Sequence, residues 1–102
     1  MSKANYRQIP NLLADRVEFE GNSMSAQVLT GNDRDGNRIA YMGRLSGDAR
    51  DVFRDRGFDY IVLSYDTPIA GVTTDGEVVI NPHKYSVTTS RHQGMLYALE
   101  RG

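Results

Sequence analysis

The segment from residue 84 to residue 93 has the highest density of side chains that could do chemistry. It runs Lys-Tyr-Ser-Val-Thr-Thr-Ser-Arg-His-Gln, and it carries hydroxyl, imidazole, guanidinium and amide groups. Such groups could bind an anion or a partner, or they could simply cap the start of a helix. Which role applies depends on the elements that position the segment.

A catalytic role for these residues is not supported by their spacing. Ser86, Ser90 and His92 are residue types of a hydrolase triad. However, Ser90 and His92 are two apart on a predicted helix and so point in different directions. The segment 21–25 nearly matches G-x-S-x-G, but Ser25 replaces the last glycine and the flanks predict strand-turn-strand. We predict no catalytic residues and a non-enzymatic protein.

Metal-binding patterns are also missing from the sequence. The chain has no cysteine, and His83 and His92 do not have the spacing of a zinc motif. The loop at residues 33–36 resembles part of a calcium loop, but Gly31 and Met42 stand where ligands would be needed. We predict no metal and no cofactor.

Length and composition indicate one small domain. A chain of 102 residues with a formal net charge of −1 has no global positive field to attract nucleic acid or an anionic membrane. No stretch approaches the length of apolar sequence that spans a membrane, and the N-terminus lacks an apolar signal region. We therefore expect a cytoplasmic protein of modest stability, which a homodimer would increase.

Period-two patterns predict most of a sheet. Val17 and Phe19 alternate with glutamates, and the residues from 24 to 29 alternate in the same way. Ile39 and Tyr41 fit a further strand, so residues 24–44 predict a hairpin around the polar loop. Residues 59–65 are apolar on both faces, which predicts a central strand covered on each side.

The second half of the sheet is predicted from turn residues. Pro68 indicates a bulge, a bend or an edge position before a strand that ends near Thr73. Asp75-Gly76 predicts a tight hairpin leading into a strand at residues 78–80.

Helical spacing predicts two helices, at about 46–57 and 89–101. In the first helix, Ser46 is the expected N-cap, and Gly57 is the expected residue in the left-handed conformation that ends the helix. Its apolar stripe is Leu45, Ala49, Val52 and Phe53, and its opposite face of Arg50, Asp51, Arg54 and Asp55 predicts weak, solvated ion pairs. In the second, His92 begins a buried face that includes Leu96 and Leu99. The predicted fold is α+β, with an antiparallel sheet of four to six strands and two packed helices.

Three motifs then resemble a known family. They are Phe19-x-Gly21-Asn22-Ser23, Tyr60-x-Val62-x-Ser64-Tyr65-x-Thr67-x-Ile69-Ala70, and Lys84-Tyr85-Ser86-x-Thr88-Thr89-Ser90-x-His92-Gln93. Together they resemble a family of small uncharacterised proteins of bacteriophages and prophages. The resemblance implies a phage accessory protein in a host cytoplasm, supplies no activity, and suggests that residues 31–58 are an insertion relative to shorter relatives.

The motifs lead to two groups of candidate residues. The candidate contacts for an anion or a partner are Lys84, Tyr85, Thr88, Thr89, Ser90, Arg91 and Gln93. The residues expected to form a structural junction are Ser64, Tyr65, Thr67 and His92. Because a helix start needs caps as well as offering an anion site, the structural and the binding roles of these hydroxyls are compatible.

Two functions follow from different observations. Near-neutral charge and a charged segment at residues 46–57 favour an interaction protein that binds a host or phage protein. The alternative is a nucleic-acid-binding module that uses the basic C-terminal strand-helix junction, with Tyr85 or Tyr97 for stacking on bases. Its basic residues are His83, Lys84, Arg91 and Arg101. The net charge and the lack of a dense basic cluster speak against this alternative.

Overall fold

The structure is a computed structural model, and it describes residue 5 and residues 7–21, 23–41, 45, 47–81 and 96–101. Its centre is a five-stranded antiparallel sheet in which the strands lie in chain order. The strands are β1 (Phe19–Glu20), β2 (Met24–Val28), β3 (Phe58–Ser64), β4 (Thr67–Thr73) and β5 (Val78–Ile80). The predicted α+β fold with an antiparallel sheet is therefore confirmed.

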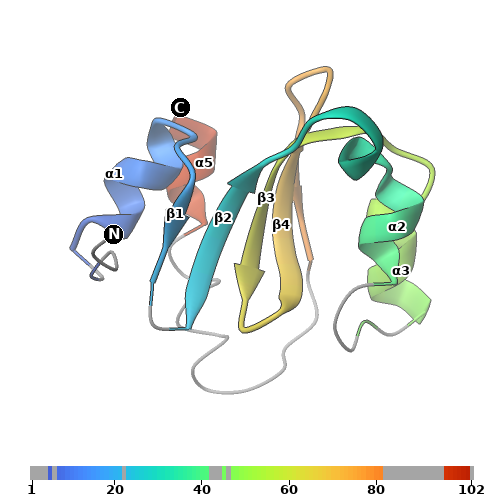
Figure 1. The fold of residues 1–102 in the computed structure, drawn as a ribbon, viewed down its shortest axis with the longest axis horizontal. Coiled ribbons are helices and arrows are strands. Elements are labelled where there is room, and N and C mark those ends of the chain that lie inside the picture. The colour runs from blue at the N-terminus through green and yellow to red at the C-terminus, as the bar shows by residue number, and fades with distance from the viewer. Residues whose placement is uncertain are drawn as a thin grey trace.

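Helices cover both faces of this sheet, as Figure 1 shows for the two helix pairs. The described helices are α1 (Ile9–Ala14), the 3₁₀ helix η1 (Gly31–Arg34), α2 (Gly36–Ala40), α3 (Gly47–Phe53) and α5 (Tyr97–Arg101). One pair is α1 with α5, and the other is α2 with α3. The sheet is thus the middle layer of three.

The central strand β3 contributes to two separate cores. Tyr60 and Val62 pack with α1 and α5, whereas Ile61 and Leu63 pack with α2 and α3. Alternate residues of a strand point to opposite faces, so a strand covered on both sides needs apolar residues at every position. The prediction of a central strand covered on each face is confirmed.

The predicted strand at Ile39 and Tyr41 is wrong, and the hairpin at 24–44 with it. This stretch forms η1 and then α2, in which the consecutive residues Ile39 and Ala40 are both buried. Asp35 starts α2 because its carboxylate accepts a hydrogen bond from the Asn37 backbone N–H, at 2.9 Å. Consecutive buried residues fit a helical face and not the alternation of a half-buried strand.

The start of α2 is held by a close backbone contact with the segment between α3 and β3. The Gly36 N–H donates to the Arg56 carbonyl oxygen at 2.7 Å, and Asp35 forms an isolated antiparallel bridge with Gly57. A Cβ atom on Gly36 would overlap the carbonyl oxygens of Phe53 and Arg56. Only glycine therefore fits at position 36.

The predicted helix at 46–57 is confirmed in place but is shorter. The described helix α3 ends at Phe53, and its apolar stripe is buried as expected at Leu45, Ala49 and Phe53. The left-handed residue after the helix is Asp55, with φ of 65°, and Gly57 is not in that conformation. Gly57 instead forms the bridge to Asp35.

The hairpins after β3 agree with the turn residues. Gly76 has φ of 88° in the β4–β5 turn, as the Asp-Gly pair predicts. The β3–β4 register shifts between Val62 and Leu63, and Leu63 is paired with Pro68. Of the predicted helix 89–101, the structure describes α5, while residues 89–95 lie outside the described residues.

Gly36→Ala tests the backbone contact that positions α2. The added methyl group must displace the backbone of α2 or α3, so we expect a loss of about 3 kcal/mol in the free energy of unfolding. Chemical denaturation followed by circular dichroism measures this loss.

Gly47→Ala is the matched control, because no described atom outside its chain neighbours and the backbone of its own helix lies within 4 Å of a Cβ built at that position. It should be neutral or stabilising by up to about 1 kcal/mol. Equal effects of the two substitutions would contradict the proposed contact.

Candidate functional site

The predicted binding residues lie outside the described part of the chain. This applies to Lys84, Tyr85, Thr88, Thr89, Ser90, Arg91 and Gln93, and to His92 of the predicted junction. Their roles remain predictions.

One end of the sheet contains the described junction residues Ser64, Tyr65 and Thr67. Ser64 is buried at the end of β3 and is paired with both Met24 and Thr67. The Tyr65 N–H donates to the Ser23 carbonyl oxygen at 2.6 Å, which links the β3–β4 turn to the start of β2. Ser23, Ser64 and Tyr65 each take part in a further interaction. This sheet end is thus a connected structural element.

Asn81 joins the same sheet end to the last strand. It is fully buried, its N–H donates to the Ile69 carbonyl oxygen at 2.9 Å, and its side-chain Nδ2 donates to the Pro68 carbonyl oxygen at 3.1 Å. A buried amide is stable only with its hydrogen bonds made. Asn81 therefore fixes where the chain leaves β5 and enters the segment that holds the predicted binding residues.

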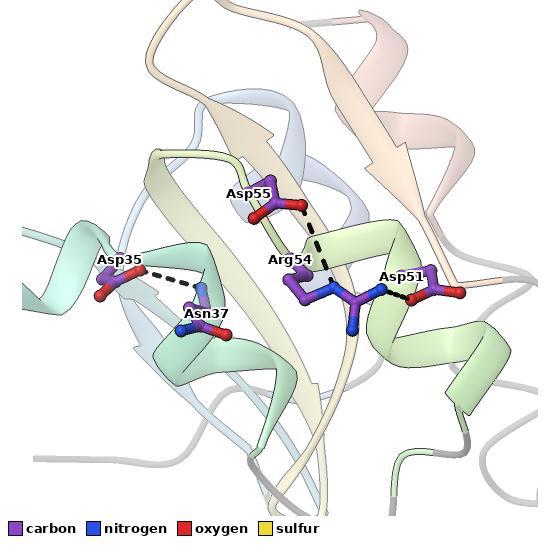
Figure 2. Close-up of polar contacts among 5 residues, drawn as sticks. All are labelled: Asp35, Asn37, Asp51, Arg54 and Asp55. Atoms are coloured by element: carbon purple, nitrogen blue, oxygen red, sulfur yellow. Dashed lines mark hydrogen bonds and ion pairs between the residues drawn. The ribbon is translucent and has the colours of Figure 1, made fainter.

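A second candidate region is the outer surface of α2 and α3, which we call the α2–α3 face. Arg54 lies between two carboxylates there: it pairs with Asp51 one turn earlier and with Asp55, at 4.0 Å in the latter pair (Figure 2). These ion pairs agree with the predicted solvated charged face. Each contributes little to stability, because exposed pairs are screened by water.

Arginine–carboxylate pairs continue around this region. Arg38 pairs with Asp33 at 2.9 Å and Arg56 with Glu77 at 3.1 Å. These pairs are also exposed, so they contribute as little to stability as those of Arg54. Arginine presents a planar fork of donors, which suits the carboxylates of a protein partner.

Tyr41 is the most exposed of the large apolar or aromatic side chains among the described residues, at 66%. The Arg50 guanidinium carbon lies 5.2 Å from the centre of its ring, within the range of a cation–π contact. Tyr41 follows α2 and Arg50 is in α3, so the contact depends on the packing of these two helices. Sequence reasoning missed it because Tyr41 was assigned to a strand.

The surroundings of the Tyr60 hydroxyl alter its acidity. Burial, with a smaller effect of the Glu18 charge, raises the pKa of the Tyr60 hydroxyl well above its usual range. That hydroxyl donates to the Val17 carbonyl oxygen at 2.8 Å, so it has a structural role. Among residues 5, 7–21, 23–41, 45, 47–81 and 96–101, no group of three or more His, Asp or Glu side chains is placed to hold a metal ion.

A model of one protein family matches residues 8–100 of the chain. The chain belongs to the family of unknown function DUF8033. No curated protein and no solved structure matches it. Membership of an uncharacterised family agrees with the resemblance seen in the sequence, whereas the phage origin and the role of residues 31–58 stay predictions. Within the described part of this DUF8033 protein, no helix is both long and apolar enough to cross a membrane.

Asn81→Ala tests whether the sheet end depends on the buried amide. The change removes two hydrogen-bonding groups and leaves the Pro68 carbonyl oxygen without this donor, so we expect a loss of about 2 kcal/mol in unfolding free energy. Urea denaturation measures it. Asn37→Ala, at an exposed position, should change stability by less than about 0.5 kcal/mol. If Asn81→Ala lowers the free energy of unfolding by no more than Asn37→Ala does, the buried amide is not needed for stability.

Proposed function

We propose that this DUF8033 protein is a non-enzymatic interaction protein of phage type that binds a host or phage protein in the host cytoplasm through its α2–α3 face. The observation that carries the proposal is the exposed Tyr41 ring with the Arg50 guanidinium held over it. Tyrosine and arginine are the residue types that contribute most binding energy at the centres of protein interfaces.

The composition of the surrounding segment supports a protein partner. Between residues 31 and 59 every basic residue is arginine and every acidic residue is aspartate. The arginines are Arg34, Arg38, Arg44, Arg50, Arg54 and Arg56, and the aspartates are Asp33, Asp35, Asp48, Asp51, Asp55 and Asp59. Interfaces are enriched in arginine and depleted in lysine, glutamate and aspartate, so the support for an interface comes from the six arginines and the absence of lysine in this segment, and not from the aspartates.

The charge balance of the same segment favours protein over nucleic acid. The six arginines and six aspartates named above cancel in charge. Affinity for nucleic acid depends on cations that replace the counterions of phosphates. Arginines already paired with aspartates supply little of that effect, whereas they can exchange partners with charged groups on a protein surface.

Crosslinking from the proposed face tests this function. A photo-reactive benzoylphenylalanine at position 41 should crosslink a defined protein in a nuclease-treated host lysate. The same residue at position 97 is the matched control, because Tyr97 is also exposed but lies on α5. With the captured partner purified, Tyr41→Ala should weaken binding about tenfold or more, and Tyr97→Ala should leave it unchanged.

The nucleic-acid alternative predicts a different outcome. In that case the lysate yields no specific crosslink from position 41, while the protein shifts nucleic acid in a gel at physiological salt. Lys84→Ala combined with Arg91→Ala should then abolish the shift. This result would replace the proposed function with the alternative.

A further inference from the structure

A hollow of about 250 Å³ lies on the side of the sheet opposite to the α2–α3 core, at the end where β3 begins and β4 ends. Its walls include Val28, Tyr60 and Val72, of which Tyr60 and Val72 belong to the core under α1 and α5. Val28 is half exposed, although it is on the same face as these buried neighbours. The hollow therefore has apolar walls and an open mouth.

Arg16, which also lines the hollow, has an unusual backbone conformation. It follows α1 with φ of 52°, and its N–H donates to Leu13 while the Val17 N–H donates to Leu12, both at 3.0 Å. This hydrogen-bond pattern is the Schellman motif, whose left-handed position is usually glycine because a Cβ atom is unfavourable there. The arginine at this position carries a backbone cost, as Asp55 and Tyr65 do at their own left-handed positions.

The Arg16 side chain gains no protein hydrogen bond at Nε in return. Its Nε atom is buried and has no hydrogen-bond partner, and the same holds for Oδ1 of Asp59 on the same hollow. Asp59 Oδ1 lies 3.2 Å from Arg34 Nε, so its charge is balanced, but this contact lacks hydrogen-bond geometry. Buried polar atoms without partners are rare in folded proteins and point to a missing ligand or water.

Two other polar side chains at the hollow already have partners. The Tyr60 hydroxyl donates to Val17, and the Thr73 hydroxyl oxygen accepts from the Glu77 N–H at 2.9 Å. Among the described residues that line the hollow, the buried side-chain atoms without a hydrogen-bond partner are Arg16 Nε, a donor, and Asp59 Oδ1, an acceptor. A ligand that satisfies both must itself carry an acceptor and a donor.

The charges near the hollow select a neutral ligand. The charged residues among those that line the hollow are Arg16, which is positive, and Asp59, which is negative. These charges sum to zero, so neither an anion nor a cation is favoured by the local field.

We propose that this hollow is a binding site for a neutral amide group with a small apolar substituent. The amide oxygen accepts from Arg16 Nε, the amide N–H donates to Asp59 Oδ1, and the substituent packs against Val28 and Val72. The amide could come from a carboxamide of a small molecule or side chain, or from a peptide backbone. This site is separate from the α2–α3 face, so the amide-binding proposal and the proposed function are tested independently.

Titration of the ¹⁵N-labelled protein with isobutyramide tests the site. The backbone resonances of Asp59, Thr73 and Gly76 should shift in a saturable way at millimolar concentrations, as expected for a ligand of this size. Isobutyrate and isobutylamine, which match it in shape but carry charge, should bind at least fivefold more weakly. N-acetylglycine methylamide distinguishes the sources, because it presents backbone amides and no carboxamide. No saturable shift with either amide, or tighter binding of isobutyrate, overturns the proposal.

Two substitutions of Arg16 separate binding from folding. Arg16→Lys keeps the charge but lacks the Nε donor, so amide binding should fall at least fivefold. Arg16→Gly should abolish binding and raise the folding equilibrium constant several-fold, since glycine suits the left-handed position. Asp55→Gly is the control: it relieves the same backbone conformation, with φ of 65°, and should leave amide binding unchanged. Retained binding in Arg16→Lys, or destabilisation by Arg16→Gly, contradicts the proposal.

Discussion

The burial of β3 on both faces is the constraint on which the rest of the structure depends. Its alternate residues supply two cores, one under α1 and α5 and the other under α2 and α3. An antiparallel sheet can leave one face to solvent, but a strand that is apolar at every position cannot. Both helical layers are therefore needed to fold the chain, and each outer surface is held in place by packing that starts at β3.

The layer of α2 and α3 needs a second constraint, because these helices have only five and seven residues. Helices of that length are not stable in isolation, so tertiary contacts must stabilise them. The Gly36 backbone contact supplies one, and the Phe53 and Phe58 rings, 5.6 Å apart, join α3 to β3 in the same core. The position of Tyr41 against Arg50 is a consequence of this packing.

The predictable parts of the fold are those where local pattern and tertiary packing agree. β3 and α3 could be placed because an unbroken apolar run and a helical stripe each admit one interpretation. Ile39 and Tyr41 also fit a period of two, so the local pattern allowed a strand there. The segment is helical because of the contact between Gly36 and Arg56, and no local pattern connects these two residues. The left-handed Arg16 was missed for a related reason, since the usual signal for that position is glycine. The Tyr41–Arg50 contact could not be predicted until α2 was known.

Two kinds of arginine among the described residues have different consequences. Arg54 on the α2–α3 face, and Arg38 and Arg56 near it, are paired with exposed carboxylates, so their charge is balanced before any partner arrives. Binding there must gain from contact area, aromatic stacking and exchange of ion pairs, which suits a protein surface better than a phosphate backbone. Arg16 is the opposite case, with a buried donor left unfilled and a backbone conformation that glycine would adopt at lower cost. The proposed amide would complete the hydrogen bond of Arg16 Nε and so would offset the cost of a buried donor without a partner.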